Sequence, residues 1–580
     1  MLKYLKKYWY YAILAPLFML GEVFADLLQP QLLAKIIDEG VLGINNGGVG
    51  STNIIITTGL AMVGIVTLGA ICGILSGVFA QLCSQKFAND LRTDCFKKIM
   101  SLSFEQTDEF KTGSLITRIT NDITQIQNLL SLLIRSFVRT ISLFIGGIIC
   151  MLKLDISFGI ILACALPLII IFIYYFLKKS RPKYKELQEK LDNLNSLMQE
   201  DVNGARVIKA FVKEDHEIKR FAKANKALSK VQLYVLKLFS YMNPVSNLIL
   251  NFTIIAVIYI GKINVSTNTG LTTGDIMAAI TYSSTILSAL LRMANLFQTW
   301  SRAQISATRV NEILNTTPII QDGSYTEETS IKGKIEFKNV SFAYPDSPKV
   351  PVLESINLVI NPGETIGILG STGSGKSSLV NLIPRFYDTT KGEVLIDDIN
   401  VKEYKLSTLR KKISIALQKS ELFSTTIFEN ITWGKEEASL DEVKKVAKVA
   451  QAKEFIESKK DGYFTMVAEK GASLSGGQKQ RINIARCILK NSEIIIFDDA
   501  TSALDLKTES DLYKSLKKEY PETTKIIIAQ RIASVKDADR IIVLDKGKIV
   551  DIGPHDKLIT SSKIYQEIYN SQLKGGANNE

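Results

Sequence analysis

Apolar residues are gathered into six long blocks in the first half of the chain, separated by shorter polar segments. Several blocks run for about 20 residues with at most one or two charges, the length that an α-helix needs to cross a bilayer. Buried helices of soluble proteins rarely need such runs. The pattern therefore predicts six membrane-spanning helices, at 9–33, 54–82, 127–151, 157–177, 239–261 and 275–299.

The polar segments between these blocks differ in their basic residues. Segments 40–53, 152–156 and 261–274 each carry at most one Lys or Arg, whereas segments 84–125 and 178–237 are rich in both. Positively charged loops are retained on the cytoplasmic side of a membrane. We therefore predict a multi-pass protein of the cell membrane whose two termini and C-terminal half lie in the cytoplasm.

The two basic segments are long but poor in Pro and Gly over most of their length. We therefore expect the spanning helices to continue beyond the membrane for about 20 residues, which is roughly 30 Å at 1.5 Å per residue. Gly113 and Gly204 are the predicted turning points of these extensions, because glycine readily leaves the helical conformation.

The pattern changes after residue 314. A polar linker is predicted at 315–334, and short β-rich runs then alternate with helical patterns, as in a parallel α/β domain. The predicted fold class is an α-helical transmembrane domain of six spans at 1–314, followed by an α/β domain at 335–575.

Composition and charge agree with this division. The chain has 580 residues, too many for a single core. Its mean hydropathy of +0.13 alongside 22% charged residues implies that apolar residues are segregated. The net charge of +12 is explained by basic loops beside anionic lipid headgroups, so nucleic acid is not a required partner. The six cysteines show no paired spacing and predict no disulfide.

The stretch TIGILGSTGSGKSSLVNLI predicts a phosphate-binding loop. An apolar strand at 365–369 precedes the loop at 370–377 and a helix follows, which is the context that such a loop requires. Its glycines let backbone amides converge on phosphate oxygens. Lys376 is expected to reach the β and γ phosphates of ATP, and Ser377 to coordinate Mg²⁺. The predicted ATP-binding residues of this stretch are Gly370, Ser371, Thr372, Gly373, Ser374, Gly375, Lys376, Ser377 and Ser378.

Two further motifs accompany this loop. A second apolar strand ends at Asp498, whose carboxylate is expected close to the metal. The motif LSGGQ, made of Leu474, Ser475, Gly476, Gly477 and Gln478, begins a predicted helix. In this order and spacing the motifs resemble those of the nucleotide-binding domain of ABC transporters. Residues 1–570 resemble a half-transporter of the exporter type, multidrug-like, with an α/β P-loop nucleotide-binding domain.

The resemblance implies further contacts with nucleotide. Tyr344 would stack on the adenine, although an ordinary aromatic residue at the end of a strand is the alternative. Gln418 would sense the γ-phosphate and the metal while contacting the membrane domain. The implied metal ligands are Ser377, Gln418 and Asp498.

The resemblance also implies contacts between subunits and domains. LSGGQ would close over a nucleotide held by another subunit, and Asp505 would lie in the loop that links the two sites. Glu469 would touch the helical extensions. Short coupling helices are implied at the tips of these extensions, near 107–114 and 204–214.

Two residues depart from the family pattern. Asp499 stands where the family has a glutamate, and Gln530 where it has a histidine. A carboxylate that activates water must lie within about 2.6–3.2 Å of it, and Asp is one methylene shorter than Glu. Gln530 can donate a hydrogen bond to phosphate but cannot carry a proton. We expect ATP to bind and to persist at this weakly hydrolytic site; the alternative is that Asp499 works adequately and the site is merely slow.

An intact LSGGQ beside an impaired catalytic pair predicts a heterodimer. A second half-transporter would supply the catalytic glutamate and histidine, while this chain closes over the partner's nucleotide. Two alternatives remain: a slow homodimeric exporter of lipids or peptides, and a membrane-anchored ATP-binding regulator or sensor that transports nothing.

Two acidic residues, Glu22 and Asp26, lie four apart within the first predicted span. Charges at membrane depth are costly and usually functional. They either attract a cationic substrate or pair with Arg135, Arg139 or Arg292 as structural links. The apolar and aromatic spans fit an amphiphilic or drug-like substrate, and they equally fit contact with membrane lipid.

Overall fold

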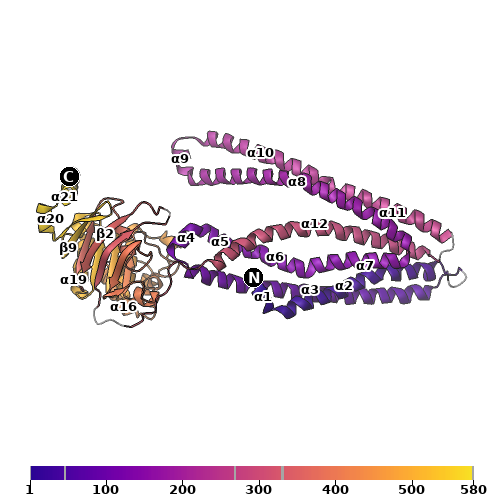
Figure 1. The fold of residues 1–580 in the computed structure, drawn as a ribbon, viewed down its shortest axis with the longest axis horizontal. Coiled ribbons are helices and arrows are strands. Elements are labelled where there is room, and N and C mark those ends of the chain that lie inside the picture. The colour runs from indigo at the N-terminus through magenta and orange to yellow at the C-terminus, as the bar shows by residue number, and fades with distance from the viewer. Residues whose placement is uncertain (1, 45–47, 267–269, 328–331, 346, 578–580) are drawn as a thin grey trace. The chain divides into compact units, whose positions relative to one another are not determined.

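The computed structural model describes residues 2–44, 48–266, 270–327, 332–345 and 347–577. The chain divides into two compact units. The helical unit comprises Met1–Met100 and Gly113–Thr316, and the α/β unit comprises Ser101–Thr112 and Thr317–Glu580. The long helices of the former and the sheets of the latter are seen in Figure 1.

The helical unit contains six segments long and apolar enough to cross a bilayer, which confirms the predicted fold class. Within the described residues these segments are Trp9–Val41, Thr52–Ser101, Thr112–Leu154, Ile156–Asn203, Glu214–Ser266 and Thr273–Met293. The main helices are α2 (Trp9–Lys35), α3 (Thr52–Ser101), α6 (Ile123–Leu132), α7 (Val138–Leu154), α8 (Ile156–Asn203), α10 (Glu214–Ser240), α11 (Met242–Ser266) and α12 (Thr273–Asn315).

The ends of the long helices differ in part from the predicted turning points. After α3 the chain turns at Lys111, whose φ is 59°, and Gly113 lies inside the helix α5 (Thr112–Thr117), so the prediction of a turn at Gly113 is wrong. Gly204 does end α8. Two short helices follow the long ones, α4 (Phe104–Phe110) and α9 (Ala205–Ala210), and α4 begins three residues before the predicted 107–114.

Glycines of α3 bring this helix close to α2. A Cβ atom at Gly69 would lie 2.8 Å from the Cβ of Ala25, and one at Gly73 would lie 2.5 Å from a carboxylate oxygen of Glu22. Between helices in a membrane, small residues let the backbones approach and so increase van der Waals packing.

The α/β unit contains two sheets. The first is antiparallel, in the order β2-β1-β4-β5, and the second has the order β10-β9-β3-β8-β7-β6 with β10 as its only antiparallel strand. The strands of the first are β1 (Ile335–Phe342), β2 (Leu353–Ile360), β4 (Lys391–Ile396) and β5 (Ile399–Asn400). Those of the second are β3 (Thr365–Leu369), β6 (Ile413–Ala416), β7 (Ile494–Asp498), β8 (Thr524–Ile528), β9 (Arg540–Asp545) and β10 (Lys548–Gly553).

Both faces of the second sheet are buried. Every residue of β7 and of β8 is buried, which explains the runs of isoleucine in these strands. Successive side chains alternate between two hydrophobic cores: Ile494 and Ile496 lie in one, Ile495 and Phe497 in the other. The main covering helices are α13 (Lys376–Asn381), α14 (Leu406–Lys411), α15 (Ile427–Thr432), α16 (Leu440–Val449), α18 (Gly476–Leu489), α19 (Leu506–Glu519), α20 (His555–Ser561) and α21 (Lys563–Ala577).

The segment predicted as a polar linker, 315–334, is not free along its whole length. Residues 317–325 belong to the α/β unit and are hydrogen-bonded to it, for example from the amide of Tyr325 to the carbonyl of Glu403 over 2.9 Å. The polar composition predicted a linker here, but it could not indicate these backbone hydrogen bonds, which leave no signal in the side-chain pattern.

The close approach at Gly69 gives a first prediction. Gly69→Ala should lower the melting temperature of the purified protein, since overpacking of a tight contact costs about 1–3 kcal/mol. Gly64→Ala in the same helix is the matched control, because a Cβ there meets nothing within 4 Å. Alanine should stabilise that turn by up to about 1 kcal/mol. Equal melting temperatures for the two variants would contradict the proposed packing.

Candidate active site

Four loops meet at one edge of the second sheet. The strands β3, β8, β7 and β6 are adjacent and parallel, so their carboxyl ends lie at the same edge, where ligands of α/β sheets bind. The loop 370–377 follows β3, Gln530 follows β8, and Asp499 follows β7. Gln418 lies just beyond β6. Residues far apart in the sequence are therefore assembled by strand order.

The loop 370–377 needs glycine at several positions. Gly373 and Gly375 have φ of +83° and +99°, which only glycine adopts without strain. A Cβ at Gly370 would lie 2.2 Å from the carbonyl oxygen of Leu544, and one at Gly375 would lie 2.9 Å from a methyl of Leu353. The loop therefore passes close to neighbouring backbone, with α13 starting directly after it.

The side chain of Lys376 folds back over this loop. Its Nζ donates hydrogen bonds to the carbonyls of Gly370 (2.8 Å) and Ser371 (2.9 Å). Burial lowers the pKa of Lys376, and the negative charges of Asp499 and Asp498 partly oppose that shift. The ammonium is thus held above the loop, where an anion such as a phosphate group would replace the two carbonyls.

Ser377 and Asp498 bring together two side-chain oxygens that could hold a metal ion. The Oγ of Ser377 donates to Oδ1 of Asp498 over 2.9 Å. Burial raises the pKa of Asp498, the Ser377 hydrogen bond lowers it, and the charge of Asp499 raises it further. Among the described residues there is no group of three or more His, Cys, Asp or Glu that could hold a metal. Mg²⁺ bound with substrate phosphates needs only one or two carboxylates, so this pair fits it.

Asp499 is held by the side chains of two glutamines. Its Oδ2 accepts hydrogen bonds from Nε2 of Gln530 (2.8 Å) and from Nε2 of Gln418 (3.1 Å). The residue is only 8% exposed, and its backbone has a left-handed φ of 51°. The two residues that depart from the family pattern therefore contact each other directly.

A glutamine that sequence reasoning missed secures this loop. Nε2 of Gln572, in α21, donates to the carbonyl of Gln530 (2.7 Å), and its Oε1 accepts from the amide of Ile532 (2.9 Å). Nothing near Gln572 in the sequence signals this role, because it comes from a helix docked against the sheet edge.

Tyr344 lies beside the phosphate-binding loop. Its hydroxyl shares a hydrogen bond with Ser378 (2.9 Å), and its ring packs edge-on against Phe342 and Tyr387, with centroids 4.9 and 5.3 Å apart. Glu469 is exposed at the start of a short 3₁₀ turn, Glu469–Gly471. The roles of these two residues stay predictions.

The signature residues build the start of α18. The Ser475 side chain accepts from the amide of Gln478 (3.3 Å), while Oε1 of Gln478 accepts from the amide of Ser475 (3.0 Å), so the motif is a capping box. Leu474 is buried, and a Cβ at Gly476 would lie 3.6 Å from the Cβ of Ala503, an ordinary van der Waals contact. A Cβ at Gly477 would lie 2.8 Å from the carbonyl oxygen of Ala503.

The loop after β7 joins this signature to Asp505. Gln480, two residues past the motif, donates to the hydroxyl of Ser502 (3.0 Å) and accepts from the amide of Ala503 (2.9 Å). Asp505 caps α19 by accepting from the amide of Thr508 (2.9 Å), a hydrogen bond that lowers the pKa of Asp505. The helix that begins with the signature motif is thus hydrogen-bonded to the loop that leads to Asp505.

In the helical unit, Arg139 lies between the two acidic residues of the first span. Its Nη2 is 3.1 Å from Oε1 of Glu22 and 3.0 Å from Oδ2 of Asp26. Two carboxylates against one guanidinium leave this trio with one excess negative charge when all three are ionised. Arg135 approaches α3 at Gly77 instead.

Six spanning segments joined to an α/β unit with a phosphate-binding loop and a signature helix define an ATP-driven membrane transporter. Residues 12–290 match the family model described as ABC transporter transmembrane region, and residues 353–502 match the model described as ABC transporter. The chain belongs to the ABC transporter family, as a half-transporter of the exporter type.

Relatives align over nearly the whole chain. An uncharacterized ABC transporter ATP-binding protein of Bacillus subtilis, YfiB, is 38% identical over 99% of this chain and 98% of its own. An ATP-dependent lipid A-core flippase of Syntrophus aciditrophicus is 34% identical over 89% and 85%. A solved structure of a bacterial Atm1-family ABC exporter with ATP bound superposes with a TM-score of 0.81 at 26% identity, covering 97% of this chain and 99% of that one.

The raised pKa of Asp498 gives a pH prediction. Only the ionised carboxylate binds Mg²⁺, so protons compete for this residue at a higher pH than for an ordinary aspartate, whose pKa is about 4. The strengthening of ATP binding by Mg²⁺ should therefore be present above that raised pKa and be lost as the pH falls through it. Titrating fluorescent ATP with and without Mg²⁺ at several pH values measures this. Asp498→Asn should remove both the strengthening and its pH dependence.

Proposed function

We propose that this chain is one subunit of a heterodimeric exporter, in which its own ATP site is weakly hydrolytic and its signature helix serves the partner's site. The observation that carries the proposal is the carboxylate of Asp499, which is shared by Gln530 and Gln418. One oxygen of this carboxylate is occupied by two amide donors, and an amide cannot carry a proton onward.

The chemistry of hydrolysis needs a base, or a carboxylate that orients water, at a precise distance. Positioned acid–base groups contribute about 10²–10⁴-fold to a rate. In this chain the carboxylate is shorter by one methylene than the family's glutamate, and both of its neighbours are neutral amides. Binding residues such as Lys376 and Ser377 are intact, so ATP would be held here longer than it is at a fully catalytic site.

The need for a second subunit is supported by α9. The helix has no buried residue, and three apolar side chains at its end are largely exposed: Val207 (60%), Phe211 (71%) and Val212 (81%). These residues follow the predicted cytoplasmic extension of α8, outside the spans. Exposed apolar patches of this kind mark interaction sites. In the head-to-tail arrangement of this family, two half-transporters form the nucleotide sites together. We therefore propose a second half-transporter as the partner of this patch.

The residues of the site then have distinct parts in the transport cycle. The loop 370–377 and Lys376 would hold the phosphates, and Ser377 and Asp498 would hold Mg²⁺, which when bound neutralises phosphate charge. Ser475 and the glycine amides of the signature would close over the nucleotide of the partner. ATP would shift the spans toward one orientation only to the extent that it binds the closed domains more strongly in that orientation.

Both termini and the α/β unit are proposed to lie in the cytoplasm, because Lys and Arg are concentrated in the segments predicted to face it.

The substrate class is proposed as amphiphilic small molecules or lipids. Relatives are named a lipid A-core flippase and, in Bacillus subtilis, a putative multidrug export protein that is 33% identical over 94% of both chains. The trio of Glu22, Asp26 and Arg139 retains an excess negative charge, which favours neutral or cationic molecules. The flippase name favours one second candidate, a slow homodimeric lipid exporter.

Purification tests the degenerate site. We expect the chain alone to bind ATP but to hydrolyse it slowly, and the double substitution Asp499→Glu, Gln530→His to raise turnover by at least about ten-fold, since it restores an acid–base pair. The matched control is Lys419→Ala, which changes an exposed side chain beside Gln418. Gln572→Glu would be unsuitable as a control, because Gln572 contacts the loop that carries Gln530. Brisk hydrolysis by the unaltered chain, abolished by Asp499→Asn, would exclude the weak site and favour the homodimer.

Transport is tested in vesicles that contain this chain with its candidate partner, a second half-transporter with Glu and His at the positions of Asp499 and Gln530. We expect ATP-dependent, vanadate-sensitive accumulation of a fluorescent amphiphilic dye. Lys376→Ala in this chain should reduce it, because binding at the weak site holds the dimer together. ATP binding without any dye or lipid movement would instead support the regulator.

A further inference from the structure

Three consecutive residues after the phosphate-binding loop contact three different parts of the α/β unit. Arg385, Phe386 and Tyr387 lie in the turns that follow α13, the helix that begins at Lys376. The ring of Tyr387 is 5.3 Å from that of Tyr344, and the ring of Phe386 is 4.6 Å from that of Phe104 in α4. Arg385 reaches residues 317–325. We call residues 385–387 the RFY turn.

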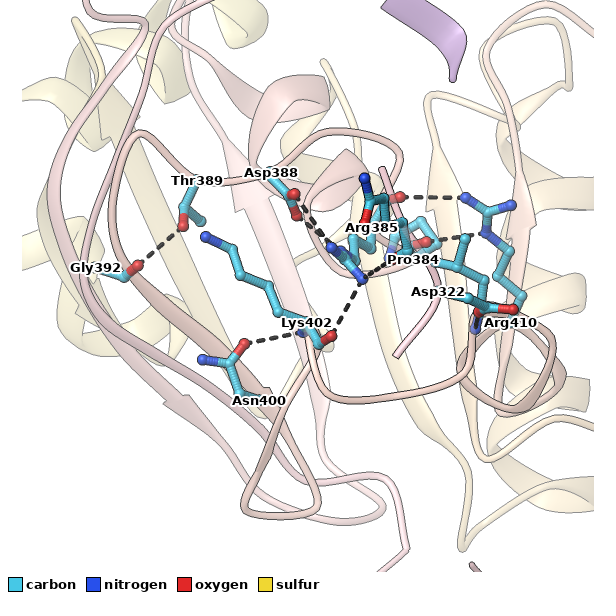
Figure 2. Close-up of polar contacts among 11 residues, drawn as sticks. Asp322, Pro384, Arg385, Asp388, Thr389, Gly392, Asn400, Lys402 and Arg410 are labelled. Atoms are coloured by element: carbon cyan, nitrogen blue, oxygen red, sulfur yellow. Dashed lines mark hydrogen bonds and ion pairs between the residues drawn. The ribbon is translucent and has the colours of Figure 1, made fainter. Parts of the chain in front are cut away.

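The side chain of Arg385 acts as a clamp. Its Nε and Nη2 donate to the two carboxylate oxygens of Asp388, over 2.8 and 3.2 Å. Its Nη1 donates to the carbonyls of Gln321 (3.0 Å) and Lys402 (3.3 Å). Figure 2 shows the guanidinium lying between Asp388 and the Lys402 carbonyl. One buried cation therefore ties the turn to the incoming segment.

The backbone of the RFY turn is itself constrained. Arg385 is 5% exposed and has a left-handed φ of 52°. Such a conformation is strained for a residue other than glycine and persists only where the surroundings fix it. Arg410 supplies part of that support: its Nε donates to the carbonyl of Pro384 and its Nη2 to that of Arg385, each over 3.2 Å (Figure 2). The Arg410 guanidinium also lies 5.5 Å from the Phe386 ring centre.

Segment 317–325 is bound along its length. Gly323 donates its amide to Tyr404 (3.1 Å), and a Cβ at Gly323 would lie 2.1 Å from the carbonyl oxygen of Glu403. The carboxylate of Asp322 accepts from the amide of Leu406, at the start of α14. The segment therefore cannot slide over the sheet without breaking these hydrogen bonds.

Gln106 joins the same segment to α4. Its Nε2 donates to the carbonyl of Thr317 (2.8 Å), and its Oε1 accepts from the amide of Ile319 (3.3 Å). The side chain is 5% exposed, so it makes these bonds out of water. Helix α4, segment 317–325 and the RFY turn are thus connected through two buried polar side chains, Gln106 and Arg385.

We propose that the RFY turn and segment 317–325 form a coupling joint between the phosphate-binding loop and the last spanning helix, with Arg385 as a positioning residue. Helix α12 ends at Asn315, and only Thr316 separates it from the bound segment. One or two residues span at most about 7 Å, so they leave little slack. Movement of α13 on nucleotide binding passes to α12 through Arg385 and Gln321. This inference goes beyond the proposed function, because it holds for either a heterodimer or a homodimer.

Hydrogen–deuterium exchange of the full-length transporter in lipid nanodiscs separates binding from coupling. The probe is ATP with Mg²⁺, and two readouts are followed: protection of peptides over 365–382, and the change in exchange over 273–315. We expect Arg385→Gln to keep the first and to reduce the second at least about five-fold, the lower range of measured coupling between sites. Arg385→Lys should behave alike, because an ammonium lacks the planar fork that reaches Asp388 and both carbonyls.

Lys402→Ala is the matched control. It removes an exposed side chain but keeps the backbone carbonyl that Arg385 contacts, so both readouts should match the wild type. If Arg385→Gln does not fold, Gln106→Met tests the same joint at the α4 side, with the same expected pattern. A wild-type response over 273–315 would overturn the proposal. So would equal loss of both readouts, which would make Arg385 a support of nucleotide binding alone.

Discussion

Parallel pairing of β7 with β6 and β8 is the constraint on which the active site depends. In-register pairing brings the ends of four strands to one edge, and the alternation of side chains along β7 sends its hydrophobic residues into two cores. Asp498 at the end of the strand then meets Ser377, and Asp499 just beyond it meets two glutamines. A slip of one residue would turn each of these side chains to the opposite face.

The same site combines binding residues that match the family motif with two residues that depart from it. Ser377 is hydrogen-bonded to Asp498, Lys376 folds back over the same loop, and none of the three departs from the motif. The departures are Asp499 and Gln530, which hydrogen-bond each other. A shorter acid and a neutral amide therefore meet in one contact. This contact is the physical basis of the proposed subunit that holds ATP and serves a partner.

The helical unit contains charged side chains and close helix–helix contacts within its predicted spans. Glycines of α3 give room for Ala25 and for the carboxylate of Glu22. Arg139 then neutralises part of the charge of Glu22 and Asp26. The Glu22 carboxylate, a costly group within a membrane, is thus accommodated because Gly73 leaves room for it and Arg139 supplies a positive charge beside it.

The sequence by itself determined the six spans, the phosphate-binding loop, the signature and the unusual Asp499, because hydropathy and short motifs are local properties of the chain. It could not determine that Gln418 and Gln530 share one carboxylate oxygen, or that Arg139 rather than Arg135 pairs with Glu22. It also predicted a turn at Gly113, whereas the chain turns at Lys111, directly after α4. Gln106, Arg385 and Gln572 carry no local signal. Their roles come from hydrogen bonds to backbone of distant segments, which only the tertiary structure decides.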